Sequence, residues 1–170
     1  VNQPNLGNTL GIALSGGTNR AIRIVDNAFH GMGARSLRVD GAGGFLDVAV
    51  TNNSFVQTTT DPCLVAHDGT FSNVAYSGNS YFSSAAADAW FCVDGARQGA
   101  AAWEAASGEA PGAASDTVAD AGRNLDRYAA HLSLGDSLGD FAAAARTQSR
   151  HSYRPELDAT NAAAYIRAGF

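Results

Sequence analysis

A pattern of apolar and polar positions recurs along the first half of the chain with a spacing of about 26 residues, within the range typical of stacked repeats. Each copy reads apolar, small or polar, apolar, two turn-like residues, asparagine, small, aromatic, and the copies occupy residues 21–29, 47–55 and 73–81. Alternation with a period of two is typical of a short β-strand that buries one face. Each copy is therefore predicted to hold one strand followed by a turn at the asparagine.

A second short strand recurs between these copies. It occupies residues 12–16, 37–41, 65–69 and 91–95, and each copy ends in a small polar residue followed by glycine. A repeat of this size cannot bury its own apolar face, so neighbouring repeats must stack to make a continuous core. We predict that residues 1–95 form parallel coils whose equivalent strands lie about 4.8 Å apart.

Stacking places equivalent residues in columns. The predicted inward columns, aromatic stack and asparagine ladder are Ile22, Val48 and Val74; Ile24, Val50 and Tyr76; Phe29, Phe55 and Tyr81; and Asn27, Asn53 and Asn79. Asparagine suits the turn because it tolerates left-handed backbone angles and can hydrogen-bond locally. Asn2 precedes Asn27 by nearly one full repeat. We therefore expect the first residues to be the tail of a further coil, and the chain to be a fragment or processed product of a larger protein.

The pattern stops after Gly95, and residues 96–170 are rich in alanine and glycine. Short helices are predicted over Ala100–Ser107, from a capping box at Ser137 to about Arg150, and over Ala159–Ala168. The last coil of a solenoid exposes strand edges and an open apolar core, and both need covering. We expect this tail to cap or brace the coils.

Composition narrows the classes of partner. The net charge is −5, and the eleven basic residues, all of them arginine, are scattered along the chain, which argues against a nucleic-acid partner. No apolar run approaches the roughly 20 residues of a transmembrane helix. The first residues lack a basic and an apolar region, so we expect any signal peptide to have been removed or to lie upstream.

The repeats resemble those of bacterial secreted right-handed parallel β-helix proteins, whose best-studied enzymes are the pectate lyases. The segment 101–109 looks like the short helical stretch that often follows the last coil in such proteins. The segments 144–150 and 165–170 are similar to the C-terminus of large β-helix proteins of environmental bacteria. The resemblance implies a mainly β, right-handed parallel β-helix of three to four coils, located outside the cell or on its surface. It leaves the activity open, because this fold carries lyases, hydrolases, epimerases, adhesins and phage tailspikes.

A polysaccharide lyase needs a base that removes the proton next to a uronate carboxylate and a cation that neutralises that carboxylate. The candidate sugar-binding residues are outward arginines and aspartates near strand ends: Arg23, Arg38, Asp40, Asp47 and Asp68. The alternative is that the aspartates are turn residues that accept backbone hydrogen bonds. Calcium is the cofactor that the resemblance would add. No repeat carries the dense Asp-x-Asp grouping of a strong calcium site, and the sequence predicts no metal ligands and no catalytic residues.

The histidines show no metal-ligand spacing. His67 shares the parity of an inward apolar column, but a one-residue bulge would turn it outward, and both orientations stay open. The separation of Cys63 and Cys92 exceeds the local period by three residues. This offset places their Cα atoms about 11 Å apart, beyond disulfide reach, so two buried free thiols are predicted.

Two functional classes follow. In the first, the chain is the C-terminal segment of a secreted protein that lays an extended polysaccharide along a parallel sheet, with any active site upstream of Val1. In the second, it is a structural or adhesive solenoid end docked on a larger surface assembly. Small outward residues such as Ala49 and Ala75 agree with the second class. In both, upstream coils or another chain are expected to cover the Val1 end.

Overall fold

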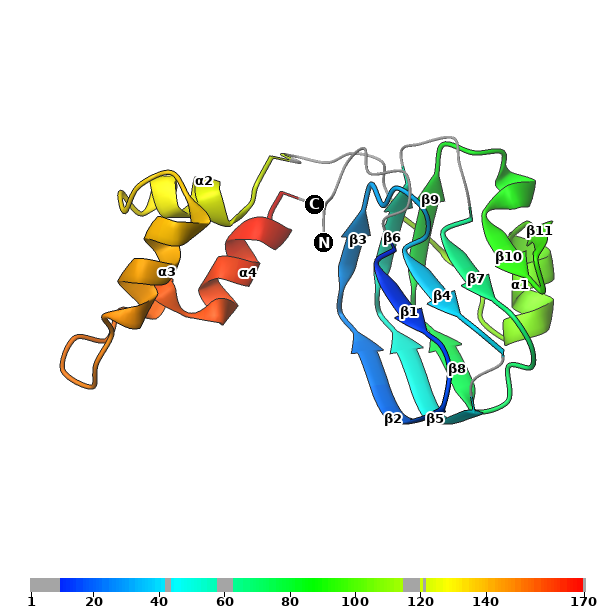
Figure 1. Ribbon diagram of the computed structural model, residues 1–170. Helices are drawn as coiled ribbons and strands as arrows, with labels where there is room; N and C mark the ends of the chain where they lie inside the picture. The colour runs from blue at the N-terminus through cyan, green and yellow to red at the C-terminus, as the bar shows by residue number, and fades with distance from the viewer. Residues whose placement is uncertain (1–9, 42–43, 58–62, 115–119, 121, 170) are drawn as a thin grey trace. The chain divides into compact units, whose positions relative to one another are not determined.

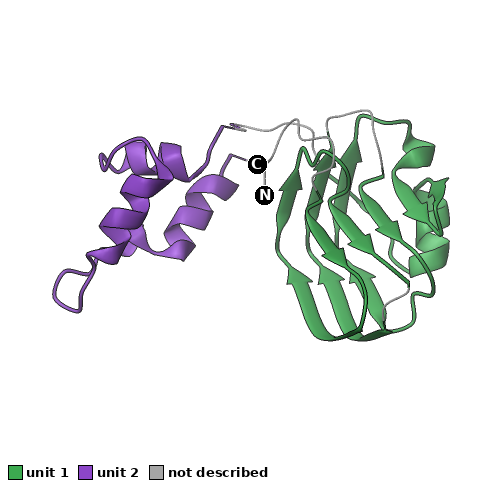
Figure 2. Ribbon diagram, viewed as in Figure 1, with its two compact units in different colours: residues 1–116 green, residues 117–170 purple. Residues whose placement is uncertain are grey.

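The computed structural model describes residues 10–41, 44–57, 63–114, 120 and 122–169. Asn2, predicted to belong to a further coil, lies outside the described residues. The chain divides into two compact units, Val1–Asp116 and Thr117–Phe170 (Figure 2). Residues 96–114 of the predicted tail therefore lie in the first unit. The protein has mixed α/β content, with parallel sheets and four α-helices among the described residues.

The first unit contains three sheets, and the chain visits them in turn (Figure 1). The three-stranded sheet has the order β2 (Thr18–Val25), β5 (Gly44–Thr51), β8 (Val74–Ser77). The four-stranded sheet has the order β12 (Gly112–Ala113), β9 (Ser80–Ser83), β6 (Ser54–Gln57), β3 (Ala28–His30). The five-stranded sheet has the order β1 (Ile12–Leu14), β4 (Leu37–Val39), β7 (Val65–His67), β10 (Phe91–Val93), β11 (Ala96–Gln98). Among the described strands, every pair is parallel except the hairpin of β10 and β11.

The strand register follows the sequence repeat. Ile22 pairs with Val48, which pairs with Val74, so residues one repeat apart lie side by side. The neighbouring column of Ile24, Val50 and Tyr76 is buried throughout. In the aromatic column, successive ring centroids of Phe29, Phe55 and Tyr81 lie 4.9 and 5.3 Å apart. The predicted columns and aromatic stack are confirmed.

The asparagine ladder is also confirmed, but the backbone explanation given for it is wrong. The left-handed residue of each turn is the one before the ladder asparagine: Asp26 (φ 56°), Asn52 (φ 56°) and Gly78 (φ 67°). The ladder asparagines are selected for their side-chain hydrogen bonds. Asn53 and Asn79 are buried, with 1% and 0% of their surface exposed.

Three different elements follow the strands of the last repeat. Strand β11 folds back antiparallel on β10, and the two residues of β12 extend the sheet beyond β9. One repeat after Val74, where a further strand would be expected, the chain forms the helix α1 (Ala100–Ser107). Gly108 ends α1 in the left-handed conformation (φ 77°). Trp103 of α1 is fully buried in the core of the first unit.

The second unit is helical. It comprises α2 (Leu125–His131), α3 (Leu138–Arg146) and α4 (Ala159–Arg167), with a 3₁₀ turn at Pro155–Leu157. The predicted capping box at Ser137 is present, because its hydroxyl and the Asp140 carboxylate bond each other's backbone N–H groups. Helix α3 ends at Arg146, before the predicted Arg150. Tyr128 packs against Tyr165, with ring centroids 4.9 Å apart, and anchors this unit.

The prediction for the cysteines is wrong, because Cys63 and Cys92 form a disulfide with their Cα atoms 5.7 Å apart. The longer distance expected from the sequence assumed that Cys63 continues the strand, but β7 begins only at Val65. Cys92 pairs in register with Ala66, and both cysteines pack with Ala66 in a small cluster separate from the main core. The bridge therefore joins two neighbouring coils.

Candidate functional site

The predicted sugar-binding residues fall into two groups on different sheets. Arg23 lies on β2 and Asp47 on β5, whereas Arg38 lies on β4 and Asp40 and Asp68 follow β4 and β7. The structure forms one ion pair within each group. It does not gather the five residues into one constellation.

The Arg23–Asp47 pair bridges the neighbouring parallel strands β2 and β5. Nη2 of Arg23 donates to both carboxylate oxygens of Asp47 at 2.7 Å, and Nη1 donates to the Asp47 carbonyl at 2.6 Å. Asp47 has a left-handed backbone (φ 58°), as do its equivalents Ala21 (φ 52°) and Asn73 (φ 69°), so this backbone conformation recurs once in each repeat. The pair is solvent-exposed, with 49% and 67% of the two side chains accessible. It forms a polar bridge that water screens and that other hydrogen-bonding groups can reach.

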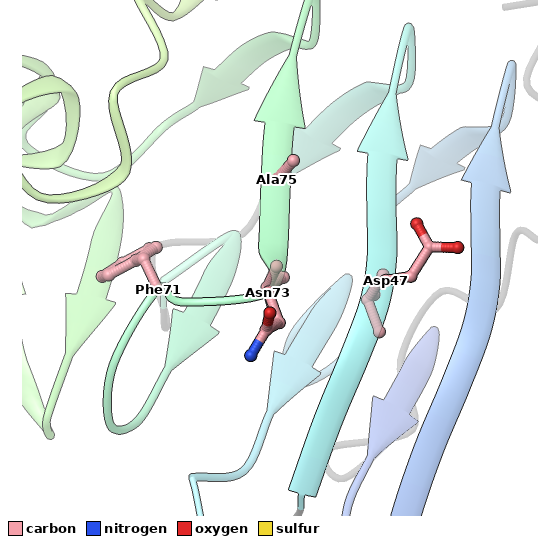
Figure 3. Close-up of a pocket in the computed structure, with 6 residues that line it drawn as sticks. Asp47, Phe71, Asn73 and Ala75 are labelled. Atoms are coloured by element: carbon pink, nitrogen blue, oxygen red, sulfur yellow. The ribbon is translucent and has the colours of Figure 1, made fainter.

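A shallow pocket of about 300 Å³ lies beside Asp47 (Figure 3). It is lined by Asp47, Val48, Phe71, Asn73, Val74 and Ala75. Figure 3 shows the Asp47 carboxylate pointing toward the neighbouring strand β2 and the Phe71 ring lying toward the opposite side. The lining therefore offers polar groups and one aromatic ring on a widely open surface.

The second group has the geometry of turn residues. Arg38 Nη2 lies 3.6 Å from Asp40 Oδ2, and the Asp40 and Asp68 backbone N–H groups donate to Leu14 and Val39 in the preceding coil. Their equivalent, Asp94, accepts a 2.6 Å hydrogen bond from the Gly69 backbone N–H. These contacts agree with the interpretation of the aspartates as turn residues.

Metal ligands do not gather within the described ranges: no group of three or more His, Cys, Asp or Glu side chains there could hold an ion. Likewise, no helix of the described chain is long and apolar enough to cross a membrane.

The most completely built polar site is one that the sequence did not reveal. Glu109 is buried, with 3% of its surface exposed, and its carboxylate accepts four hydrogen bonds. Oε1 accepts from the backbone N–H and Nδ2 of Asn79 at 3.0 and 2.7 Å, and Oε2 accepts from the Tyr81 hydroxyl at 2.7 Å and Trp103 Nε1 at 3.1 Å. Glu109 takes the next place in the ladder in space, but it lies 30 residues after Asn79, whereas the asparagines are 26 apart. The repeat period therefore gave no signal for it.

Glu109 affects the two tyrosines that lie near it. Burial raises the pKa of the Tyr81 hydroxyl far above its ordinary value, and the charge of Glu109 adds to this effect. Burial and then Glu109 raise the pKa of Tyr76 in the same direction. Both hydroxyls therefore remain protonated and act as hydrogen-bond donors across the physiological range.

His67 points inward and is fully buried, so the open question of its orientation is settled. Its Nδ1 lies 3.0 Å from the Tyr76 hydroxyl and its Nε2 lies 3.1 Å from the Thr70 carbonyl. Since a carbonyl only accepts, Nε2 carries the proton and Nδ1 accepts from Tyr76. Burial lowers the pKa of His67, opposed by the Thr70 carbonyl and the charges of Asp68 and Asp94. The ring also stacks on Phe71 at 3.9 Å and serves as a core residue.

Comparison of the chain with protein-family models, with curated proteins and with solved structures gives no match.

Proposed function

We propose that this chain is the closed end of a right-handed parallel β-helix protein and that its role is structural. The carrying observation is that successive repeats each add strands to the same three sheets, while β11, α1 and Glu109 cover the last coil. A covered last coil closes its apolar core, and the strands that end its sheets, β11 and β12, are short, which limits pairing with other molecules. The unit would therefore stabilise a solenoid and keep it from associating at this end.

The location that we propose is outside the cell or on its surface. The Cys63–Cys92 disulfide supports it, because such bonds form and persist in oxidising compartments. The bridge, which lies in a cluster separate from the main core, would hold the last coil against its neighbour.

The closing role is tested through Trp103, whose ring stacks on Phe91 at 4.6 Å and meets Tyr76 edge-on at 4.9 Å. Replacing it with alanine should destabilise the first unit by about 3–5 kcal/mol and expose the apolar end of the coils. We expect Trp103→Ala to associate in analytical ultracentrifugation under conditions that keep the parent chain monodisperse.

The matched control is Trp90→Ala, which removes the half-buried second tryptophan. It should lower stability without causing association. Equal association of both variants would mean that Trp103 has no particular role in closing the coils.

A second candidate function is binding of an extended, anionic polysaccharide along the outer face of β2, β5 and β8. The pocket beside the exposed Arg23–Asp47 pair favours it, because a planar guanidinium recognises carboxylates and a carboxylate accepts from hydroxyls.

Isothermal titration with polygalacturonate tests this function. Arg23→Ala should abolish binding, whereas Asp47→Asn, which releases the guanidinium, should strengthen it. Arg20→Ala, on the same strand, is the control, and a response equal to that of Arg23→Ala would exclude the site.

A further inference from the structure

The ladder has a direction. The Asn27 backbone N–H and Nδ2 both donate to Asn53 Oδ1 at 3.0 Å. The same two groups of Asn53 donate to Asn79 Oδ1 at 2.8 and 2.9 Å, and those of Asn79 donate to Glu109 Oε1. Between rungs, the donors therefore point toward the last coil and the side-chain oxygens toward the first, and Nδ2 of Asn53 and Asn79 also donates back to the Ile24 and Val50 carbonyls of the preceding repeat.

The two ends of the ladder are chemically different. At the last coil stands a carboxylate, which only accepts, and its second oxygen is occupied by Tyr81 and Trp103. At the first coil stands Asn27, which is half-buried and acts only as a donor among the hydrogen bonds of the described chain. In the later ladder residues Asn53 and Asn79, the equivalent Oδ1 atom accepts two hydrogen bonds from the preceding asparagine.

The apolar columns also continue to the first coil. Ile22 is half-buried, whereas its partners Val48 and Val74 are 2% and 3% exposed. Ile12 is likewise half-buried, although Leu37 beside it has no exposed surface. Both β1 and β2 end their sheets among the described strands. This end therefore combines the strand edges of β1 and β2 with half-buried apolar side chains. It also carries Asn27 Oδ1, an acceptor to which no ladder residue donates within the described ranges.

We propose that the end formed by β1 and β2 binds one further parallel coil that brings an asparagine to the ladder position, with its backbone N–H and Nδ2 directed at Asn27 Oδ1. A second copy of the chain, stacked end to end, would bring its Glu109 end instead. That end carries α1, the hairpin strand β11 and an acceptor-only carboxylate, which would oppose another acceptor. The coil that binds here must therefore carry an asparagine whose donors are available to Asn27 Oδ1. Copies of this chain are not expected to stack end to end. This inference rests on the proposed β-helix.

The test inserts a second copy of residues 18–43 ahead of Thr18, so that the new coil carries its own equivalent of Asn27. We expect the insertion to raise the denaturant midpoint of the first unit, because each added repeat contributes a stacking interface. Changing the inserted asparagine to aspartate replaces the Nδ2 donor with an acceptor. The unfolding equilibrium constant should then rise at least about tenfold. Thr18→Asp in the same inserted copy, at a position exposed in the parent chain, is the control for charge and should have little effect.

The outcomes separate the inference from the proposed function. A stabilising insertion that tolerates aspartate equally well would overturn the directional ladder and leave the β-helix in place. An insertion without stabilisation would overturn docking at β1 and β2. Concentration-dependent end-to-end association of the parent chain would overturn the claim that Glu109 prevents self-extension.

Discussion

Glu109 is the residue whose chemistry departs most from the repeat. Four donors converge on its carboxylate, and only the Tyr81 hydroxyl among them can also accept. In Glu109→Gln, the amide Nε2 is expected on the side of this hydroxyl, where it would also face the Trp103 indole N–H, and a buried donor would lose its acceptor. We expect a loss of about 1–3 kcal/mol in the free energy of unfolding, measured by chemical denaturation.

The matched control is Glu104→Gln, which makes the same change on the exposed face of α1. It should alter stability by less than about 0.5 kcal/mol. Combining Glu109→Gln with Trp103→Phe removes the conflicting donor, so the two changes should cost less together than their sum. Strict additivity would contradict the assignment of the Trp103 hydrogen bond.

His67 predicts how stability depends on pH. Its pKa is lowered in the folded state by burial, so the unfolded chain binds the proton more readily. The stabilisation is complete above the unfolded-state pKa of about 6.5 and is lost as the pH falls below it. Unfolding free energies measured between pH 8 and pH 5 should decline toward acid.

His67→Gln should be less stable than the parent at pH 8 and show a shallower decline. Burial also lowers the pKa of His30, which should leave a residual slope. An unchanged slope in the variant would show that His67 does not carry the effect.

For single residues, the sequence predicted the stacked columns of equivalent residues better than it predicted the contacts of the candidate site residues. The columns follow from parity and period, which are properties of the local pattern. The Arg23–Asp47 contact was not predictable, because it depends on the left-handed backbone at Asp47. The interpretation of the aspartates as turn acceptors holds for Asp94, which accepts from Gly69.

In the asparagine ladder, the contribution of each asparagine to the free energy of unfolding should depend on its place in the ladder. Asn53 donates to Asn79 Oδ1 and the Ile24 carbonyl and accepts from Asn27, whereas Asn27 lies at the first coil of the ladder. Replacing Asn53 with alanine leaves several buried groups unpaired and should destabilise by about 2–3 kcal/mol, against about 1 kcal/mol for Asn27→Ala. Denaturation of both variants checks this order, and the reverse order would argue against the ladder.

The elements that the sequence predicted are those with a strong period or a capping signal. The strands of the three-stranded sheet, the strands β1, β4, β7 and β10, and the helices α1, α3 and α4 belong to this group. The strands β3, β6 and β9, which follow the ladder asparagines, were not predicted as separate strands. Helix α2 was missed, because it has only seven residues and its main signal is the Asn124 side chain that accepts from the Arg127 N–H. The hairpin strand β11 was missed because the repeat ends at Gly95, and pairing beyond it is decided by the edge of β10.

For the whole molecule, the disulfide should act on one unit only. Cys63 and Cys92 both belong to the first unit, and their sequence separation is 29 residues. Closing a loop of that length contributes up to about 3–4 kcal/mol through the unfolded state. The double variant Cys63→Ala, Cys92→Ala should lower the stability of the sheets, followed by the near-ultraviolet signal of the tryptophans.

The helices of the second unit, probed by amide exchange of α2, α3 and α4, should keep their stability in that variant. An equal loss in both units would show that they unfold as one.

The central claim is that the stacked repeats are closed at Trp103 and Glu109, whereas β1 and β2 end their sheets among the described strands. Site-resolved amide hydrogen exchange under native conditions tests it most directly, because protection reports local opening. We predict slow exchange in β5, β8 and β10 and distinctly faster exchange in β1 and β2. Equal protection of equivalent strands, or fastest exchange in β8 and β10, would contradict the account.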